Sequence, residues 1–306
     1  MKVVITGALG HIGSALIRNH DLLSRANEIV LIDNLLTQRY ASLFSLPGEG
    51  QFRFLEGDVS WKLTSEVLDG VDFVIHLAGT IEPVASVDNP EALFSNNLRI
   101  TRHVVDQCAA NDVPMVFVSS TSVYTPSSER VDENSSELFP ASPYAQCKIQ
   151  EESYILEHLG VDESVVFRFG TIFGASPGMR FQTAVNKFCW QVATGVPIEV
   201  WSTAENQLRP YLEIGDAVNV LTKAVTERIL PGKVVNAVTC NASVSDVLEA
   251  IRVCGRRFKV RYVDSPIMNA LSFEASTEYA RALGFDFSGD LQTGVRETLA
   301  ILGHLE

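Results

Sequence analysis

The sequence lacks several features that would place it in common classes of protein. Its five cysteines contain no CxxC pair and do not cluster with histidine, so neither a metal site nor a disulfide framework is expected. Basic residues are in the minority, and the net charge of −13 argues against a nucleic-acid partner. No apolar run is long enough to span a membrane, and the N-terminus runs into a glycine turn without a signal-peptide pattern. We therefore expect a protein of a reducing compartment, the cytoplasm, with no membrane partner.

The composition is that of an ordinary globular protein. The chain has 306 residues, of which 46% are hydrophobic and 20% are charged. A chain of this length can bury a substantial core without disulfides or a structural metal. Because its surface is acidic overall, local basic residues must capture any anionic ligand.

Residues 1–170 alternate short apolar runs with stretches of helical spacing, which predicts a doubly wound parallel sheet of the Rossmann type. The expected strands are Lys2–Thr6, Glu28–Ile32, Phe52–Glu56, Phe73–Leu77, Met115–Ser119 and Ser164–Phe169. The expected helices between them are Ile12–Asn19, Glu91–Ala110 and Tyr144–Leu159.

Residues 171–306 are interpreted as a smaller α/β domain that binds the substrate, one segment of which could return to the first sheet. Helices are expected near Phe181–Thr194, Asp216–Ile229, Ser243–Val253 and Thr277–Leu283. Short strands are expected at Ile198–Trp201, Val234–Ala237 and Lys259–Val263.

The first strand leads into Thr6-Gly7-Ala8-Leu9-Gly10-His11-Ile12-Gly13, a glycine-rich turn that opens a helix. Gly7 permits the tight turn, Gly10 lets a pyrophosphate approach the backbone, and Gly13 lets the helix pack on the strand. The helix N-terminus, at His11 and Ile12, faces the phosphates. The alternative is a strand–turn–helix whose glycines are only structural.

The second strand ends at Asp33, 20 residues after Gly13. A carboxylate in this position can accept the ribose hydroxyls of NAD and would repel the 2′-phosphate of NADP. Asn34 follows, where an arginine could have held such a phosphate.

Two further strand ends are candidate contacts for the cofactor. Asp58-Val59 follows the third strand and could receive the adenine amino group, although a simple turn aspartate explains Asp58 equally well. His76-Leu77-Ala78-Gly79 ends the fourth strand at the carboxyl edge of the sheet, where ligands bind in such folds. We interpret His76 as a buried, satisfied histidine, and Leu77, Ala78 and Gly79 as cofactor contacts.

Tyr144-Ala145-Gln146-Cys147-Lys148 places a phenol and an ammonium one helical turn apart on one face. A phenol with a reference pKa of about 10 is a poor base at neutral pH, but an adjacent ammonium and a cationic nicotinamide favour the phenolate. The phenolate can take a proton from a sugar hydroxyl as hydride leaves the same carbon. Ser120, near the end of the fifth strand, can hold the same oxygen, unless it only satisfies backbone groups.

Six motifs in order make the sequence similar to a known family. They are TGALGHIG from residue 6, DNL from 33, HLAG from 76, SSTSVY from 119, YAQCK from 144 and RFGTIFG from 168. Together they resemble the extended short-chain dehydrogenase/reductase family, and within it the NAD-dependent sugar-nucleotide epimerases and dehydratases such as UDP-galactose 4-epimerase. The resemblance implies NAD as cofactor, with Tyr144 and Lys148 among its contacts, and a nucleotide sugar as substrate.

The resemblance also implies substrate contacts. Asn97 matches an asparagine near the reacting centre, and Arg209 matches an arginine that clamps the nucleotide diphosphate, for which its fork of donors is suited. Arg180 and Asn186 are further candidates for the same anion, with a solvated helix face as the alternative. Thr171 stands where the family usually has a substrate-contacting asparagine.

The expected reaction follows from the residues beside Ser120, which stands where the family carries its catalytic Ser or Thr. The family's 4,6-dehydratases have Asp-Glu directly after that position, and its decarboxylases have Glu two residues after it, whereas this chain has Thr121 and Ser122. Hydride removal and return at C4 needs only Ser120, Tyr144, Lys148 and NAD, so we favour a 4-epimerase. The open alternatives are a keto-sugar reductase or dehydrogenase, a 4,6-dehydratase, and a structural or sensing member that only binds NAD.

A homodimer is also implied, because the family usually pairs two helices, here Glu91–Ala110 and Tyr144–Leu159, with their copies in a four-helix bundle. The apolar positions expected at this interface are Ile100, Val104, Val105, Cys108, Ile149, Tyr154 and Ile155.

We predict that the protein binds NAD more tightly than NADP, because Asp33 would repel the 2′-phosphate. Replacing Asp33 by alanine should narrow the difference between the two cofactors. Titration of the wild type and Asp33→Ala with both cofactors measures this, and NADP binding as tight as NAD in the wild type would contradict it. Arg39 is the nearby cation that could reduce the preference.

Overall fold

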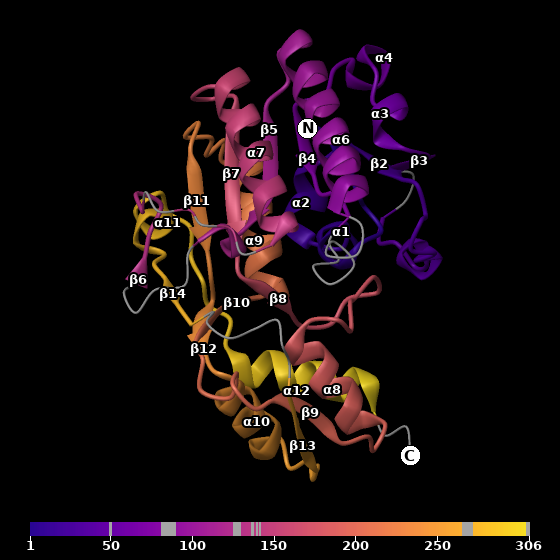
Figure 1. The fold of residues 1–306 in the computed structure, drawn as a ribbon. Coiled ribbons are helices and arrows are strands. Elements are labelled where there is room, and N and C mark those ends of the chain that lie inside the picture. Colours follow the sequence, from indigo (N-terminus) through magenta and orange to yellow (C-terminus); the bar gives the residue numbers. More distant parts are fainter. Residues whose placement is uncertain are drawn as a thin grey trace.

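The computed structural model describes residues 1–48, 51–80, 90–124, 130–135, 138, 140, 142–264 and 272–303. A sheet with helices on both faces forms the upper part of the molecule in Figure 1, and a smaller group of helices and short strands lies below it. Within the described residues, no helix is both long and apolar enough to cross a membrane.

The central sheet has seven strands, all parallel, in the order β11-β7-β5-β4-β1-β2-β3. These strands are β1 (Lys2–Thr6), β2 (Glu28–Asp33), β3 (Phe52–Glu56), β4 (Phe73–His76), β5 (Met115–Ser120), β7 (Ser164–Phe169) and β11 (Val234–Ala237). The predicted doubly wound sheet is confirmed, and each of the first six strands lies within one residue of its predicted range. All carboxyl ends meet at one edge of the sheet.

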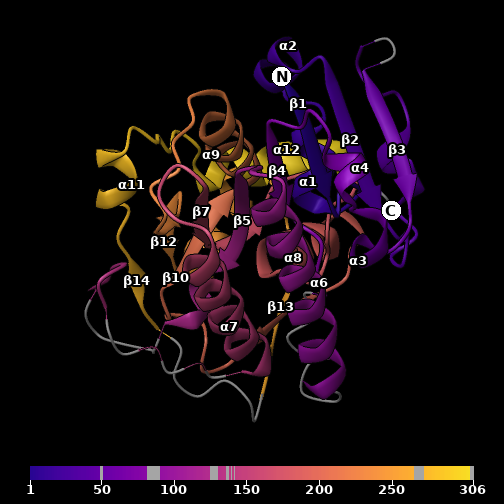
Figure 2. The same ribbon diagram turned by 90° about the horizontal axis from the view of Figure 1, so that it is seen from above.

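Successive residues of each strand point to opposite faces of the sheet and pack into two separate hydrophobic cores. Val3 and Ile5 pack with α1 (His11–Leu16), α2 (His20–Arg25) and α9 (Ile214–Thr226), whereas Val4 packs with α6 (Pro90–Ala110) and α7 (Pro143–His158). Figure 2 shows α6 and α7 on one side of the sheet and α9 on the other. Strands that are buried on both faces explain the nearly continuous apolar runs in the sequence.

The lower part of the molecule has its own core, in which Phe173, Val185, Val247 and Val295 are buried. Its elements are β8 (Thr171–Phe173), α8 (Ala184–Ala193), β9 (Ile198–Trp201), β10 (Arg209–Glu213), β12 (Cys240–Ala242), α10 (Val244–Val253), β13 (Val260–Val263) and α12 (Leu291–Leu302). The smaller sheets are β12-β10-β8 and β13-β9.

Several short elements complete the fold. They are the 3-10 helices η1 (Tyr40–Leu43) and η2 (Thr121–Val123), the helices α3 (Val59–Lys62), α4 (Ser65–Leu68) and α11 (Glu278–Ala282), and the strand pair β6 (Arg130–Val131) and β14 (Glu274–Ala275).

The elements expected after residue 170 are all present within a few residues of their predicted ends, and β11 pairs with β7 in the main sheet. The strands β8, β10 and β12 and the helix α12 were not predicted. Asp290 accepts a hydrogen bond from Thr293 N at 2.8 Å and caps α12, so an aspartate before an apolar stretch was a signal for this helix.

The apolar residues expected at a dimer interface lie mostly inside the protomer. Ile100, Val104, Val105, Cys108 and Ile155 are 0–4% exposed and pack against the central sheet. Their assignment to a helix-bundle interface is therefore wrong, because the apolar stripe of each helix covers the protomer's own sheet. Ile149 and Tyr154 are half-buried and pack against neighbouring core clusters.

Candidate active site

The glycine turn between β1 and α1 lies beside the end of β4 and is tied to Asp33. Gly7 has a φ of +63°, and a Cβ on it would lie 2.6 Å from the backbone nitrogen of Ala78, so only glycine fits. The Asp33 carboxylate accepts hydrogen bonds from Leu9 N at 3.0 Å and Leu35 N at 2.9 Å. Its oxygens keep further lone pairs for ribose hydroxyls. A backbone turn with a carboxylate at its rim fits a dinucleotide.

The segment after β8 is seated directly on this turn. His11 Nε2 lies 2.8 Å from the Gly174 carbonyl oxygen, and Gly178 N donates to Ser14 Oγ at 2.9 Å. Burial lowers the pKa of His11 to about 4, so this imidazole is neutral at pH 7. A Cβ on Gly178 would overlap the carbonyl oxygen of Leu9. This close packing carries the chain from β8 across the turn to Arg180.

Two arginines face the turn. Arg39 Nη1 lies 3.8 Å from the point where a Gly10 Cβ would be. Burial lowers the pKa of Arg39, the charge of Arg180 lowers it further, and Asp33 opposes both effects. The Arg180 charge also lowers the pKa of Tyr144, so this arginine is within electrostatic range of both the turn and α7. Arg39 was not among the predicted site residues, because only the fold brings it to the turn.

The predicted catalytic pair lies on α7 against the end of β5. Ser142 caps this helix by accepting from Ala145 N at 3.2 Å, so that Tyr144 falls in its first turn. Lys148 Nζ lies 5.9 Å from the centre of the Tyr144 ring and donates to the Val118 carbonyl oxygen at 3.3 Å. Both side chains are buried, being 7% and 6% exposed.

Burial decides the charge of the phenol in the protein alone. It raises the pKa of Tyr144, and the Lys148 ammonium only partly opposes it. Burial also disfavours the Lys148 ammonium, but the Glu151 carboxylate and Tyr144 outweigh it, so the pKa of Lys148 is raised. Lys148 therefore acts on the phenol in the predicted direction, while burial has the larger effect. The phenol is neutral and the lysine is charged at pH 7.

Two neighbouring polar residues hold backbone groups. Ser120 Oγ accepts from Ser122 N at 3.1 Å, and its hydroxyl hydrogen can still be donated to a substrate oxygen. Asn97 is buried, and its amide accepts from Thr80 N at 2.8 Å and donates to Thr80 O at 2.9 Å. Asn97 thus supports the backbone just after Gly79, and its contact with substrate stays a prediction.

The candidate substrate contacts come from three elements. Arg209, on β10, is half-buried, burial lowers its pKa, and no carboxylate in the described part of the chain lies within 4.0 Å of its side-chain nitrogens. Thr171 is exposed at the start of the adjacent strand β8. Asn186 is fully buried, accepts from Gly174 N and donates to Arg180 O at 2.9 Å, so the solvated-face alternative is wrong for it. Its contact with an anion stays a prediction.

Asp58 and His76 lie at or just after the ends of two strands of the central sheet, and the structure shows what each of them contacts. Asp58 accepts from Ser60 N at 2.9 Å and pairs with Arg99 at 3.1 Å, as a turn aspartate does, and its adenine contact stays a prediction. His76 is 1% exposed, lies 2.6 Å from Thr6 Oγ1, and has a pKa lowered by burial to about 3. Its interpretation as a buried, satisfied histidine is confirmed.

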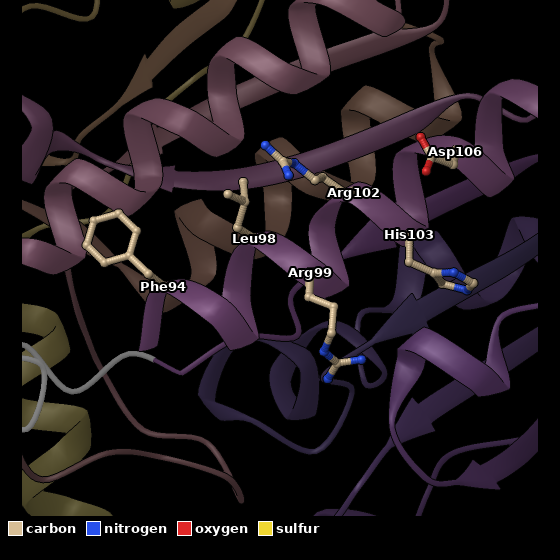
Figure 3. Close-up of a pocket in the computed structure, with 6 residues that line it drawn as sticks. All are labelled: Phe94, Leu98, Arg99, Arg102, His103 and Asp106. Atoms are coloured by element: carbon tan, nitrogen blue, oxygen red, sulfur yellow. The ribbon is translucent and has the colours of Figure 1, made fainter. Parts of the chain in front are cut away.

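A hollow of about 580 Å³ lies along α6 (Figure 3), and Phe94, at one end of its lining, packs against Tyr144 and Cys147. The residues that line it are Phe94, Leu98, Arg99, Arg102, His103 and Asp106. None of them is a predicted site residue.

The motifs and the geometry agree with a sequence profile described as the NAD dependent epimerase/dehydratase family, which matches residues 3–237. The chain belongs to this family. Its cofactor is NAD, for which the turn at Gly7 and the carboxylate of Asp33 are suited.

Similar members of the family include enzymes with different named reactions. An uncharacterised UDP-glucose epimerase of Bacillus subtilis (strain 168), YtcB, is 27% identical over 100% of this chain and 99% of its own. A UDP-glucuronate 4-epimerase of Thermodesulfobacterium geofontis (strain OPF15) is 27% identical over 85% of this chain and 83% of its own. The solved structure of TunA, an NAD-dependent NDP-hexosamine 5,6-dehydratase of tunicamycin biosynthesis, is 28% identical with a TM-score of 0.84, covering 98% of this chain and 96% of its own.

We predict that Gly178→Ala weakens NAD binding, because the added methyl group forces the Leu9 and Gly10 carbonyls of the turn to move. Overpacking of this kind costs about 1–3 kcal/mol of unfolding free energy. NAD titration and urea unfolding measure the two effects. In the control Gly160→Ala, the new Cβ meets only Glu163 Oε2 at 3.6 Å, and both quantities should stay close to wild type. Wild-type NAD affinity in Gly178→Ala would contradict the prediction.

Proposed function

We propose that this protein interconverts the C4 epimers of a UDP-sugar through a 4-keto intermediate. The observation that carries the proposal is the buried pair of Tyr144 and Lys148 on α7, packed against the end of β5 at the same sheet edge as the glycine turn. The names of the UDP-glucose and UDP-glucuronate relatives support a UDP-sugar as the substrate.

Each catalytic side chain has a separate task. Ser120 donates its hydroxyl hydrogen to the C4 oxygen and holds it beside Tyr144. The Tyr144 phenolate takes the proton of the C4 hydroxyl and later returns it, while the Lys148 ammonium stabilises the phenolate. NAD, when bound, supplies the acceptor and donor of the C4 hydride. Inversion requires the keto-sugar ring to present its opposite face before the hydride is returned to C4.

The arginines are suited to hold the rest of the substrate while the sugar turns. Arg209 is half-buried without a carboxylate partner within 4.0 Å in the described part of the chain, so an anionic diphosphate would compensate its charge. Arg180 acts electrostatically on Tyr144 and could contact the diphosphate or an acidic sugar. Epimerisation at C4 requires the sugar ring to turn over between hydride removal and return. A diphosphate that stays bound while the sugar ring is free to rotate meets this requirement.

A dehydratase is the second candidate, favoured by the similarity to the solved 5,6-dehydratase. Removal of water needs an acid–base pair for a second carbon, in addition to Tyr144. The two residues that follow Ser120 are Thr121 and Ser122, which form the 3-10 helix η2 and carry no carboxylate. Their hydroxyls favour the epimerase.

The proposal is tested by incubating the NAD-loaded enzyme with UDP-glucose and, separately, with UDP-glucuronate, followed by proton NMR of the sugar. We expect a mixture of C4 epimers and no net accumulation of NADH. A product lighter by one water would instead identify a dehydratase, and stoichiometric NADH would identify a dehydrogenase.

The division of labour within the pair predicts different pH profiles for two variants. Tyr144→Phe removes the proton acceptor and should lose about 10²–10⁴-fold in rate at every pH while still binding NAD. Lys148→Ala should lose both rate and NAD retention, and part of the rate should return at high pH, where the phenol ionises without help. A pH–rate profile of both variants checks this. Recovery of Tyr144→Phe with pH would show that another group is the base.

We also propose that the outer face of α6, with that of α7, forms a homodimer interface. Leu98 and Phe94 are only half-buried there and line the hollow on α6 together with the exposed Arg102 (Figure 3). A hollow of mixed apolar and charged residues on a helix that covers its own sheet with the opposite face suits a second copy related by two-fold symmetry.

Light scattering of the wild type should give twice the mass of one chain. Arg102→Glu places a carboxylate in the hollow near Asp106 and should shift the mass toward a monomer. Arg257→Glu makes the same charge change on an exposed loop of the lower part and should leave the dimer intact. A wild-type monomer at micromolar concentration would overturn the interface.

A further inference from the structure

A buried carboxylate lies directly behind the catalytic lysine. Glu151 is 1% exposed and follows Lys148 by about one turn of α7. Its Oε2 lies 3.0 Å from Lys148 Nζ. Its other oxygen accepts a hydrogen bond of 2.5 Å from Thr101 Oγ1 on α6. Thr101 is itself fully buried. The two helices are thus joined, inside the protein, through the carboxylate that faces the lysine.

A line of hydrogen bonds supports Thr101 from the central sheet. Thr6 Oγ1 accepts from Leu77 N and Ala78 N, both at 3.2 Å, so its own hydrogen is directed to His76 Nδ1 at 2.6 Å. The neutral His76 ring then carries its hydrogen on Nε2, which lies 3.3 Å from Thr101 Oγ1. Thr101 in turn donates to Glu151.

The direction of these bonds explains why the line ends at a carboxylate. Every donor, from Thr6 through His76 and Thr101, points toward Glu151, and the Lys148 ammonium approaches from the other side. A buried carboxylate is costly unless it is paired and hydrogen-bonded, and here one oxygen accepts from Thr101 while the other forms the ion pair with Lys148. The sheet therefore holds the carboxylate, and the carboxylate faces the lysine.

Glu152, the next residue on α7, is paired with a different cation. Glu152 is also buried, and it pairs with Arg168 of β7 at 2.7 Å and accepts from Ser119 Oγ. That pair ties α7 to the sheet without contacting Lys148. The two adjacent carboxylates thus have separate partners: Glu151 pairs with Lys148, and Glu152 pairs with Arg168.

We propose that Glu151 is a positioning residue of the active site: its carboxylate, held by Thr101 and His76, keeps the Lys148 ammonium in place beside Tyr144. The inference rests on the proposed roles of Tyr144 and Lys148. Glu151 pairs with the ammonium, the Val118 carbonyl accepts a hydrogen bond from it, and the centre of the Phe117 ring lies 4.5 Å from Nζ, so the ammonium is held on several sides.

The charged surroundings of Lys148 define what the loss of Glu151 would do. Tyr144, Cys147 and Glu151 face the ammonium from α7, and His76 faces it from β4. Burial lowers the pKa of Lys148, and the Glu151 carboxylate is the first of the groups that oppose this effect. Without that carboxylate the effect of burial dominates, and the lysine should lose its proton at a lower pH.

The test measures the protonation of Lys148 in the purified, NAD-loaded protein without substrate. The chain has seven lysines, so NMR of protein labelled with ¹³Cε-lysine gives few signals, and the Lys148 signal is assigned by its loss in Lys148→Ala. We expect the titration midpoint of Lys148 to move to lower pH in Glu151→Gln, which has nearly the same shape but no charge.

Glu152→Gln is the matched control, because it neutralises the adjacent buried carboxylate while leaving the Lys148 contact intact. Its Lys148 titration should match the wild type. An unchanged midpoint in Glu151→Gln, or an equal movement in Glu152→Gln, would overturn the proposal. If Glu151→Gln does not fold, Glu151→Asp withdraws the carboxylate by one methylene and should move the midpoint in the same direction, and an unmoved midpoint there would also overturn it.

This experiment is independent of the reaction that the enzyme catalyses. Failure of the proposed function would appear as the absence of C4 epimers, whereas the titration of Lys148 needs no sugar nucleotide. A lowered midpoint in Glu151→Gln would support the positioning role even if the reaction were a dehydration.

Discussion

The parallel register of the seven-stranded sheet is the constraint on which the active site depends. Because every strand runs in the same direction, all carboxyl ends meet at one edge, and the groups that follow them converge there. Thr6, Asp33, His76 and Ser120 come from four different strands and are far apart in the sequence. Backbone hydrogen bonds between strands fix their spacing.

Charge burial on α7 is the second constraint. The helix carries Lys148, Glu151 and Glu152 into the protein, and each of them faces an opposite charge. Removing one partner of a buried pair leaves the other uncompensated, which typically costs 3–5 kcal/mol. The same pairs that make the helix costly to displace also keep a charged lysine beside a neutral phenol.

The upper and lower parts of the molecule share strands at the site. On β10, Leu212 packs in the core beside the main sheet, whereas its neighbour Tyr211 packs in the lower core. The segment from Gly174 to Gly178 then lies on the glycine turn and leads to Arg180. Residues expected to contact cofactor and substrate are therefore connected through a few tightly packed positions, and Gly178 is one of them.

The sequence by itself determined the sheet, the glycine turn, Asp33 and the spacing of Tyr144 and Lys148, because these features depend on periodicity and on neighbours in the chain. It also predicted the chemistry of Ser120, although its hydrogen bond to Ser122 N came from the structure. Short elements such as β8 and β12 carry too few residues for a periodic signal.

Only the tertiary structure decided which surface packs against the apolar face of each helix and which charged side chains form ion pairs. Val104 and Ile155 have the spacing of an interface, but helical periodicity does not distinguish a second copy from the protomer's own sheet. Arg39 reaches the glycine turn through a loop, and Glu151 meets Thr101 from another helix. Such contacts join residues distant in the chain, and their energies depend on burial, which no local pattern encodes.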